Sequence, residues 1–173
     1  MKTITLIAVA IATLSAGCTI QNDKMARAPI EHRYYVTDPV SRQDVPAQSQ
    51  EQAIAQLIVL VNLERQKRGL QPLVFDAGLS GVAQSHADAM SRTGKFHHID
   101  AEGNDFRDRM EANGYIAKRG KENLGHGQRS AQLLVSRWMA SKAHKAALLD
   151  KRSNAIGIGH TSDNYWVAIP YAK

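Results

Sequence analysis

The feature that most constrains the fold is a change in the spacing of the apolar residues along the chain. From about residue 54 to residue 139 they recur every three or four positions, which is the period of amphipathic helices. Residues 155–160 and 165–169 are instead two short strand-like runs, and Thr161-Ser162-Asp163-Asn164 between them is a hairpin signal. Helices first and strands last predict an α+β domain in which helices pack on a small antiparallel sheet.

Four helices are expected before the strands, and their ends carry recognisable signals. Ser49 and Gln52 form a capping-box pattern, and Asp76 and Ser130 are good N-caps. Glycines stop the first three helices. The predicted segments are residues 49–69, 76–94, 104–113 and 130–141. His86 falls on the apolar stripe of the second helix, so we expect a packed core histidine there rather than a ligand.

The first 17 residues read as a signal peptide that is removed from the mature protein. Lys2 gives a positive start, residues 4–14 are apolar but too few to span a bilayer, and the segment ends in Ala16-Gly17-Cys18. This ending resembles the lipobox of bacterial lipoproteins, in which the cysteine is acylated. The alternatives are an ordinary cleaved signal peptide and a membrane anchor that is never cut.

Residues 18–49 are polar and rich in proline, and they predict a tether between an acylated Cys18 and a folded domain over residues 50–173. Acyl chains on Cys18 would attach the protein to a membrane of the cell envelope. The residue after Cys18 is Thr19 rather than aspartate. This resembles lipoproteins that are sent to the outer membrane of Gram-negative bacteria.

Cys18 is the only cysteine of the chain, and the chain is basic, with a formal net charge of +6. The domain therefore has no internal disulfide and no catalytic thiolate. Removing residues 1–17 takes away one lysine and leaves +5. This charge suits anionic lipid or an anionic envelope polymer, or simply a soluble basic surface. No basic stripe interleaved with aromatic residues is present, so nucleic acid is not an expected partner. A partner protein is not indicated.

Chemistry is expected in the stretch from residue 96 to residue 125. Its polar residues stand in loops interrupted by glycines rather than on apolar stripes. The candidates there are the adjacent His97 and His98 and the pair Glu122 and Asn123. Arg109 is expected to form a structural ion pair.

Seven short pieces of the chain follow one another in a characteristic order. They are Val61-Asn62-Leu63-Glu64-Arg65, Gly69-Leu70-x-Pro72-Leu73, His86-Ala87-x-x-Met90, Phe96-x-His98 with Gly103, Arg109 and Gly114-Tyr115, Glu122-Asn123-Leu124, Trp138-Met139-x-Ser141-x-x-His144 and Ile156-Gly157-Ile158-Gly159. Together they resemble the bacterial branch of the CAP superfamily (cysteine-rich secretory proteins, antigen 5 and pathogenesis-related 1; the SCP domain). The likeness covers about residues 53 to 170 and implies an α-β-α sandwich with helices on both faces of the sheet.

The resemblance implies a surface cleft in which two histidines hold a divalent metal such as zinc beside two acidic residues. Carried over by position, the histidines are His98 and His144, the first acid is Glu122, and Ser141 stands where many relatives have the second acid. Asn123 belongs to the same cleft. His97 has the wrong spacing for it. With one acid missing and Lys142 and Lys145 beside His144, weak zinc binding is expected.

Two of these residues also have plain structural interpretations. Glu122 would form a salt bridge with Lys121 or Arg119, and His144 would be a solvated histidine at a helix end.

Three functions remain open. The first is a non-enzymatic binding module for a lipid or other small amphiphile. The second is a metal-assisted hydrolase or protease with Glu122 as base. The sequence has no Gly-x-Ser-x-Gly, His-Glu-x-x-His or catalytic cysteine, so metal-bound water is the only nucleophile left for such an enzyme. The third is an envelope scaffold with a relict cleft.

Overall fold

The computed structural model describes residues 48–173. The predicted signal peptide, Cys18 and the tether up to residue 47 lie outside the described residues. The elements in chain order are α1 (Gln50–Gln66), β1 (Val74–Phe75), α2 (Ala77–Thr93), α3 (Phe106–Ala112), the 3-10 helix η1 (Ala117–Arg119), β2 (Asn123–His126), α4 (Ala131–Ala140), α5 (Lys142–Leu148), β3 (Ala155–His160) and β4 (Tyr165–Tyr171). In residues 48–173, no helix has both the length and the apolar composition of a membrane span.

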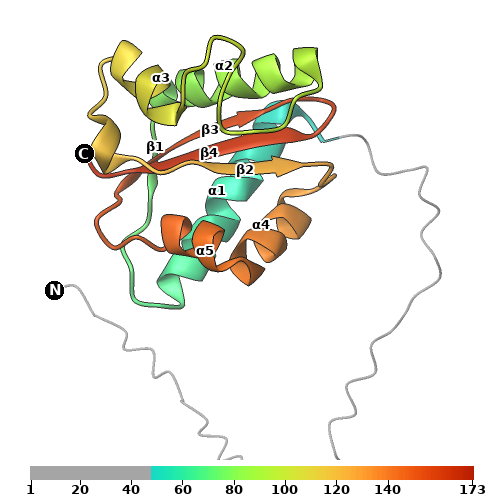
Figure 1. The fold of residues 1–173 in the computed structure, drawn as a ribbon. Helices are drawn as coiled ribbons and strands as arrows, with labels where there is room; N and C mark the ends of the chain where they lie inside the picture. The colour runs from blue at the N-terminus through green and yellow to red at the C-terminus, as the bar shows by residue number, and fades with distance from the viewer. Residues whose placement is uncertain (1–47) are drawn as a thin grey trace, which may run out of the picture. The chain divides into compact units, whose positions relative to one another are not determined.

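The strands form one four-stranded sheet in the order β1-β3-β4-β2. The β3–β4 hairpin is antiparallel, as predicted, and β2 adds a second antiparallel pair with β4. The two-residue strand β1 was not predicted, and it adds a parallel pair with β3 at one edge. Figure 1 shows α2 and α3 on one face of the sheet and α1, α4 and α5 on the other. The predicted α+β class and the sandwich that the resemblance implied are therefore confirmed.

Each face of the sheet has its own hydrophobic core, because successive strand residues point to opposite faces. Ile156, Ile158 and Trp166 face α1, α4 and the end of α5. Val167 and Ile169 face the other way, against α2 and α3. All five are buried. The predicted core histidine His86 lies on the α2 side and is only 2% exposed.

Helix α2 lies directly against β3, and two glycines permit this contact. A Cβ atom on Gly157 would lie 2.4 Å from the Leu79 backbone carbon, and one on Gly159 would lie 2.5 Å from that of Ala83. Any larger residue at these positions would push the helix away from the strand.

Beyond β1, the outer edge of β3 is completed by side chains of α2. Ser80 Oγ accepts from the Ile158 N–H at 3.0 Å. Gln84 accepts from the His160 N–H and donates to the His160 carbonyl, both at 3.0 Å. Ser80 and Gln84 therefore supply hydrogen-bond partners to the edge of β3, and Gln50 Nε2 of α1 also donates to the His160 carbonyl.

The structure confirms the predicted N-caps of three helices and contains one α-helix that the sequence did not predict. The Ser49–Gln52 capping box is formed, and Asp76 and Ser130 cap α2 and α4. The fourth helix ends at Ser141, as predicted, but the chain resumes a helix at once as α5. The sequence did not predict α5, which has only seven residues and no side chain that caps its start.

A buried arginine joins the end of α1 to the segment before β3. Arg65 is fully buried, and its guanidinium donates four hydrogen bonds to backbone carbonyls. The acceptors are the carbonyls of Gln71, Leu148, Asp150 and Ser153, at 2.7 to 3.0 Å. This network fixes the position of α5 relative to the core on the α1 and α4 side of the sheet.

Candidate functional site

A cavity of about 540 Å³ opens between β2, α5, η1 and the loop before α3. Its lining includes His98, Glu122, Asn123 and His144. Four of the five predicted cleft residues thus meet in one place, although they come from distant parts of the sequence. Ser141 does not line this cavity. It lies at the junction of α4 and α5, and its N–H donates to the last carbonyls of α4.

Glu122, directly before β2, has a buried carboxylate with both oxygens engaged. Its side chain is 1% exposed. Oε1 lies 2.7 Å from His98 Nδ1, and Oε2 accepts from Arg109 Nη2 at 2.8 Å. Lys121 pairs with Asp150 instead, at 2.8 Å. The predicted salt bridge of Glu122 with Lys121 or Arg119 was therefore wrong, because Arg109 reaches the carboxylate from α3.

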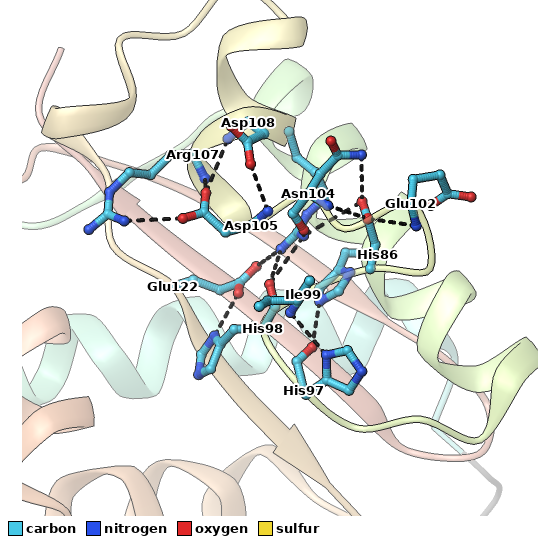
Figure 2. A network of polar contacts seen from close by, with 12 residues as sticks. His86, His97, His98, Ile99, Glu102, Asn104, Asp105, Arg107, Asp108 and Glu122 are labelled. Carbon is cyan, nitrogen blue, oxygen red and sulfur yellow. Dashed lines mark hydrogen bonds and ion pairs between the residues drawn. The ribbon is translucent and has the colours of Figure 1, made fainter.

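Arg109 also holds the loop that carries His98. It donates to the carbonyls of His98 and Asn104, at 3.2 and 2.8 Å, and lies 3.8 Å from the Asp100 carboxylate. Figure 2 shows His98, Asn104 and Glu122, which Arg109 contacts, lying close together. The predicted ion-pair role of Arg109 is confirmed, and the arginine positions both the loop and the acid.

His98 is the exposed end of this network, with 54% of its side chain accessible. The hydrogen bond to Glu122 raises the pKa of His98 above its ordinary value, against the opposing effect of burial. Because Nδ1 is bound to the carboxylate, Nε2 is the nitrogen left for a ligand. A carboxylate that orients a histidine in this way is the arrangement that supports histidine ligands in metal sites.

His97 and His86 have other roles. His97 Nδ1 accepts from the N–H of Ile99 at 3.1 Å, and His97 does not line the cleft cavity. The His97 carbonyl lies 3.1 Å from His86 Nε2 (Figure 2). Burial lowers the pKa of His86. The core histidine therefore anchors the loop on which His98 stands.

His144 approaches the cleft from α5. Its ring centroid lies 6.4 Å from that of Trp138, and Asn123 Nδ2 donates to the His144 carbonyl at 3.0 Å. Burial and, second, the charge of His98 lower the pKa of His144. The alternative prediction placed His144 at a solvated helix end. His144 is instead half-buried within α5, because Asn123 and Trp138 hold this helix against β2 and α4.

The cleft does not provide a complete zinc site. Catalytic zinc uses three protein ligands, and the two imidazoles are the free donors here, because the Glu122 carboxylate is engaged on both oxygens. Across residues 48–173, no group of three or more His, Cys, Asp or Glu side chains is arranged to hold a metal ion. The residues present therefore do not fit a tightly held zinc.

Sequence reasoning missed the cations of the cleft. Arg107, Lys118 and Lys121 also line the cavity. The signal was the basic run Lys118-Arg119-x-Lys121 directly before Glu122. These residues make the rim of the cleft positive.

Comparison with known proteins gives one family model and several bacterial relatives. The model described as the cysteine-rich secretory protein family (CAP) matches residues 58–169. An uncharacterized protein of Bacillus subtilis, YkwD, is 32% identical over 111 residues, which are 64% of this chain and 43% of YkwD. The uncharacterized membrane protein YlbC of the same organism is 28% identical over 104 residues, 60% of this chain and 30% of YlbC. The chain thus spans less than half the length of these relatives.

Solved structures share the fold at low sequence identity. An extracellular protein of Bacillus anthracis that contains an SCP domain has a TM-score of 0.64 and 22% identity, covering 69% of this chain and 40% of that protein. An outer surface protein of Borrelia burgdorferi has a TM-score of 0.63 and 23% identity, covering 72% of this chain and 96% of that protein.

Proposed function

The chain belongs to the cysteine-rich secretory protein (CAP) family, and from this premise we propose that it is a binding module whose cleft takes up a lipid or another small amphiphile. We further propose that it works at the cell envelope, attached through Cys18. Its activity is binding rather than turnover.

The observation that carries this proposal is the cleft itself. A volume of about 540 Å³ lies within the usual range for small-molecule sites. Its walls combine apolar residues, among them Phe106, Ala143 and Ala147, with the polar groups of His98 and His144. A mixed wall of this kind suits a molecule with one apolar and one polar part.

The state of Glu122 favours binding over hydrolysis. A general base needs an oxygen that can reach the proton of a bound water. Both oxygens of Glu122 are already engaged, and the carboxylate is buried. Glu122 is therefore better suited to orienting His98 than to accepting a proton from water. The metal-assisted hydrolase is the second candidate, and a scaffold with a relict cleft is the third.

Attachment to the envelope rests on the lipobox-like segment around Cys18. The names of several similar proteins agree with such a location, since they include an extracellular protein, an outer surface protein and a membrane protein. The Cys18→Ala variant is expected to appear in the soluble fraction of cells. A variant that stayed entirely in the membrane fraction would overturn the acylation proposal.

Filling the cleft tests the binding function. Ala143 lines the cavity, whereas Ala146 is exposed on the same helix and lies outside it. In the purified full chain, Ala143→Trp is expected to abolish binding of a short-chain diacylglycerol in calorimetry, while Ala146→Trp retains it. Equal binding by both variants, or none by the wild type, would contradict the proposal. Ester turnover by the wild type that Glu122→Gln abolishes would favour the hydrolase instead.

A further inference from the structure

A second, smaller cavity adjoins the cleft and has a different character. It has a volume of about 220 Å³, and four cationic side chains and one carboxylate line it. The cations are Lys118, Arg119, Lys121 and Arg152, and the carboxylate is Asp150. We call this group of five the basic cavity.

The backbone holds the basic cavity in a fixed shape. The segment after η1 runs antiparallel to the end of β4, with Gly120 opposite Tyr171. The Lys121 N–H donates to the Pro170 carbonyl at 3.1 Å, and the Ala172 N–H donates to the Arg119 carbonyl at 3.0 Å. The cations therefore project from a paired segment rather than from a free loop.

The one carboxylate of the basic cavity is already neutralised. Asp150 lies 2.8 Å from Lys121 Nζ and 2.9 Å from Arg152 Nη2. These two cations hold the pKa of Asp150 well below its usual range. Asp150 thus orients Lys121 and Arg152, and these two cations more than balance its charge.

Two cations of the basic cavity lack such a partner. Lys118 and Arg119 are exposed, and neither forms an ion pair with any residue in the described part of the chain. With four cations around one carboxylate, the cavity carries excess positive charge. Arginine and lysine together are the usual ligands of phosphate and carboxylate groups.

The basic cavity adjoins the cleft, because Lys118, Gly120 and Lys121 line both. The charged end of a molecule at this border of the cleft would therefore lie close to the cations of the basic cavity. We propose that the basic cavity binds the phosphate or carboxylate group of a ligand whose apolar part lies in the cleft. This inference rests on the proposed function and specifies its ligand as an anionic amphiphile.

The test compares three probes on the full chain by calorimetry: a short-chain diacylglycerol, its phosphate monoester, and inorganic phosphate. The variant combines Arg119→Gln with Arg152→Gln, because these two residues line the basic cavity but not the cleft. Arg137→Gln on α4 is the matched control, since Arg137 is exposed and lines neither cavity. The wild type and the control are expected to bind the phosphate monoester about tenfold more tightly than the diacylglycerol. The double variant is expected to lose this preference but to keep its affinity for the diacylglycerol.

Each result separates the two proposals. Equal affinity for diacylglycerol and monoester, unchanged in the double variant, would overturn the anionic ligand and leave the lipid-binding module intact. Binding of inorganic phosphate alone, lost in the double variant, would support a site for free anions and overturn the lipid proposal. Binding of none of the three probes would overturn both. The preference is also expected to weaken as salt is raised, because the cations are exposed.

Discussion

Two polar networks, both centred on an arginine, show how structure and site differ in this fold. Arg65 is fully buried, and backbone carbonyls accept all four of its hydrogen bonds. Arg109 is instead linked through Glu122 to His98, which is half exposed in the cleft. The first network is closed and the second has one open end. A closed polar network holds elements together, whereas an open one presents a group to a ligand.

The largest effect is expected from breaking the closed network. Arg65→Met removes a donor from four backbone carbonyls, of which those of Leu148 and Ser153 are buried, and should lower the free energy of unfolding by about 4 kcal/mol. Arg65→Lys keeps the charge but lacks the planar fork, so an intermediate loss is expected. Chemical denaturation of the full chain measures both.

The control for Arg65 is Arg68→Met, just beyond the end of α1. Arg68 is exposed and pairs with Glu64, so its loss should cost less than about 1 kcal/mol. Similar losses for Arg65→Met and Arg68→Met would show that the closed network does not hold the fold.

Breaking the open network should cost less stability and alter the site. Glu122→Gln weakens two charge-assisted hydrogen bonds and is expected to lower the free energy of unfolding by about 2 kcal/mol. The pKa of His98 should fall at the same time, because Glu122 is what raises it. Glu111→Gln, on the exposed face of α3, is the matched control. An unchanged His98 titration in Glu122→Gln would contradict the assigned role of Glu122.

The sequence predicted the helices and the hairpin better than it predicted either arginine network. Helix starts at Ser49, Asp76 and Ser130 are local signals, and the β3–β4 hairpin follows from spacing and turn residues. Such features depend on neighbours in the chain. The role of Arg65 depends on the carbonyls of Leu148 and Ser153, which only the fold brings near. One signal was available, since Arg65 continues the apolar stripe of Leu57 and Val61 at the next helical position.

The site was predictable only through the family resemblance. His98 and His144 meet because α5 packs beside β2, and nothing in their spacing requires this. The same limit explains Ser141. By position it falls where relatives have an acid, but the structure places it at a helix junction outside the cavity.

His98 on the loop and His86 on α2, which anchors that loop, should respond to pH in opposite directions. The pKa of His98 is raised above 6.5 by Glu122, so its contribution to stability is present below pH 6.5 and is lost as pH rises through the raised pKa. The pKa of His86 is lowered by burial, so its contribution is present above pH 6.5 and is lost as pH falls through the lowered pKa. NMR titration of the imidazole C–H signals is expected to place the pKa of His98 above 6.5 and that of His86 below it. The reverse order of the two pKa values would contradict the assigned roles of Glu122 beside His98 and of burial at His86.

The smallest effect is expected from zinc, and it tests how far the open network is from a metal site. Two imidazoles without a free third donor should bind zinc only weakly. Millimolar zinc should then raise the free energy of unfolding by less than about 1 kcal/mol. His98→Ala should remove this increment, whereas His97→Ala should retain it, because His97 is adjacent in sequence but does not line the cleft. Stabilisation by several kcal/mol at stoichiometric zinc would mean that the cleft rearranges to recruit further ligands, and Glu122, released from Arg109, is the residue that would have to move.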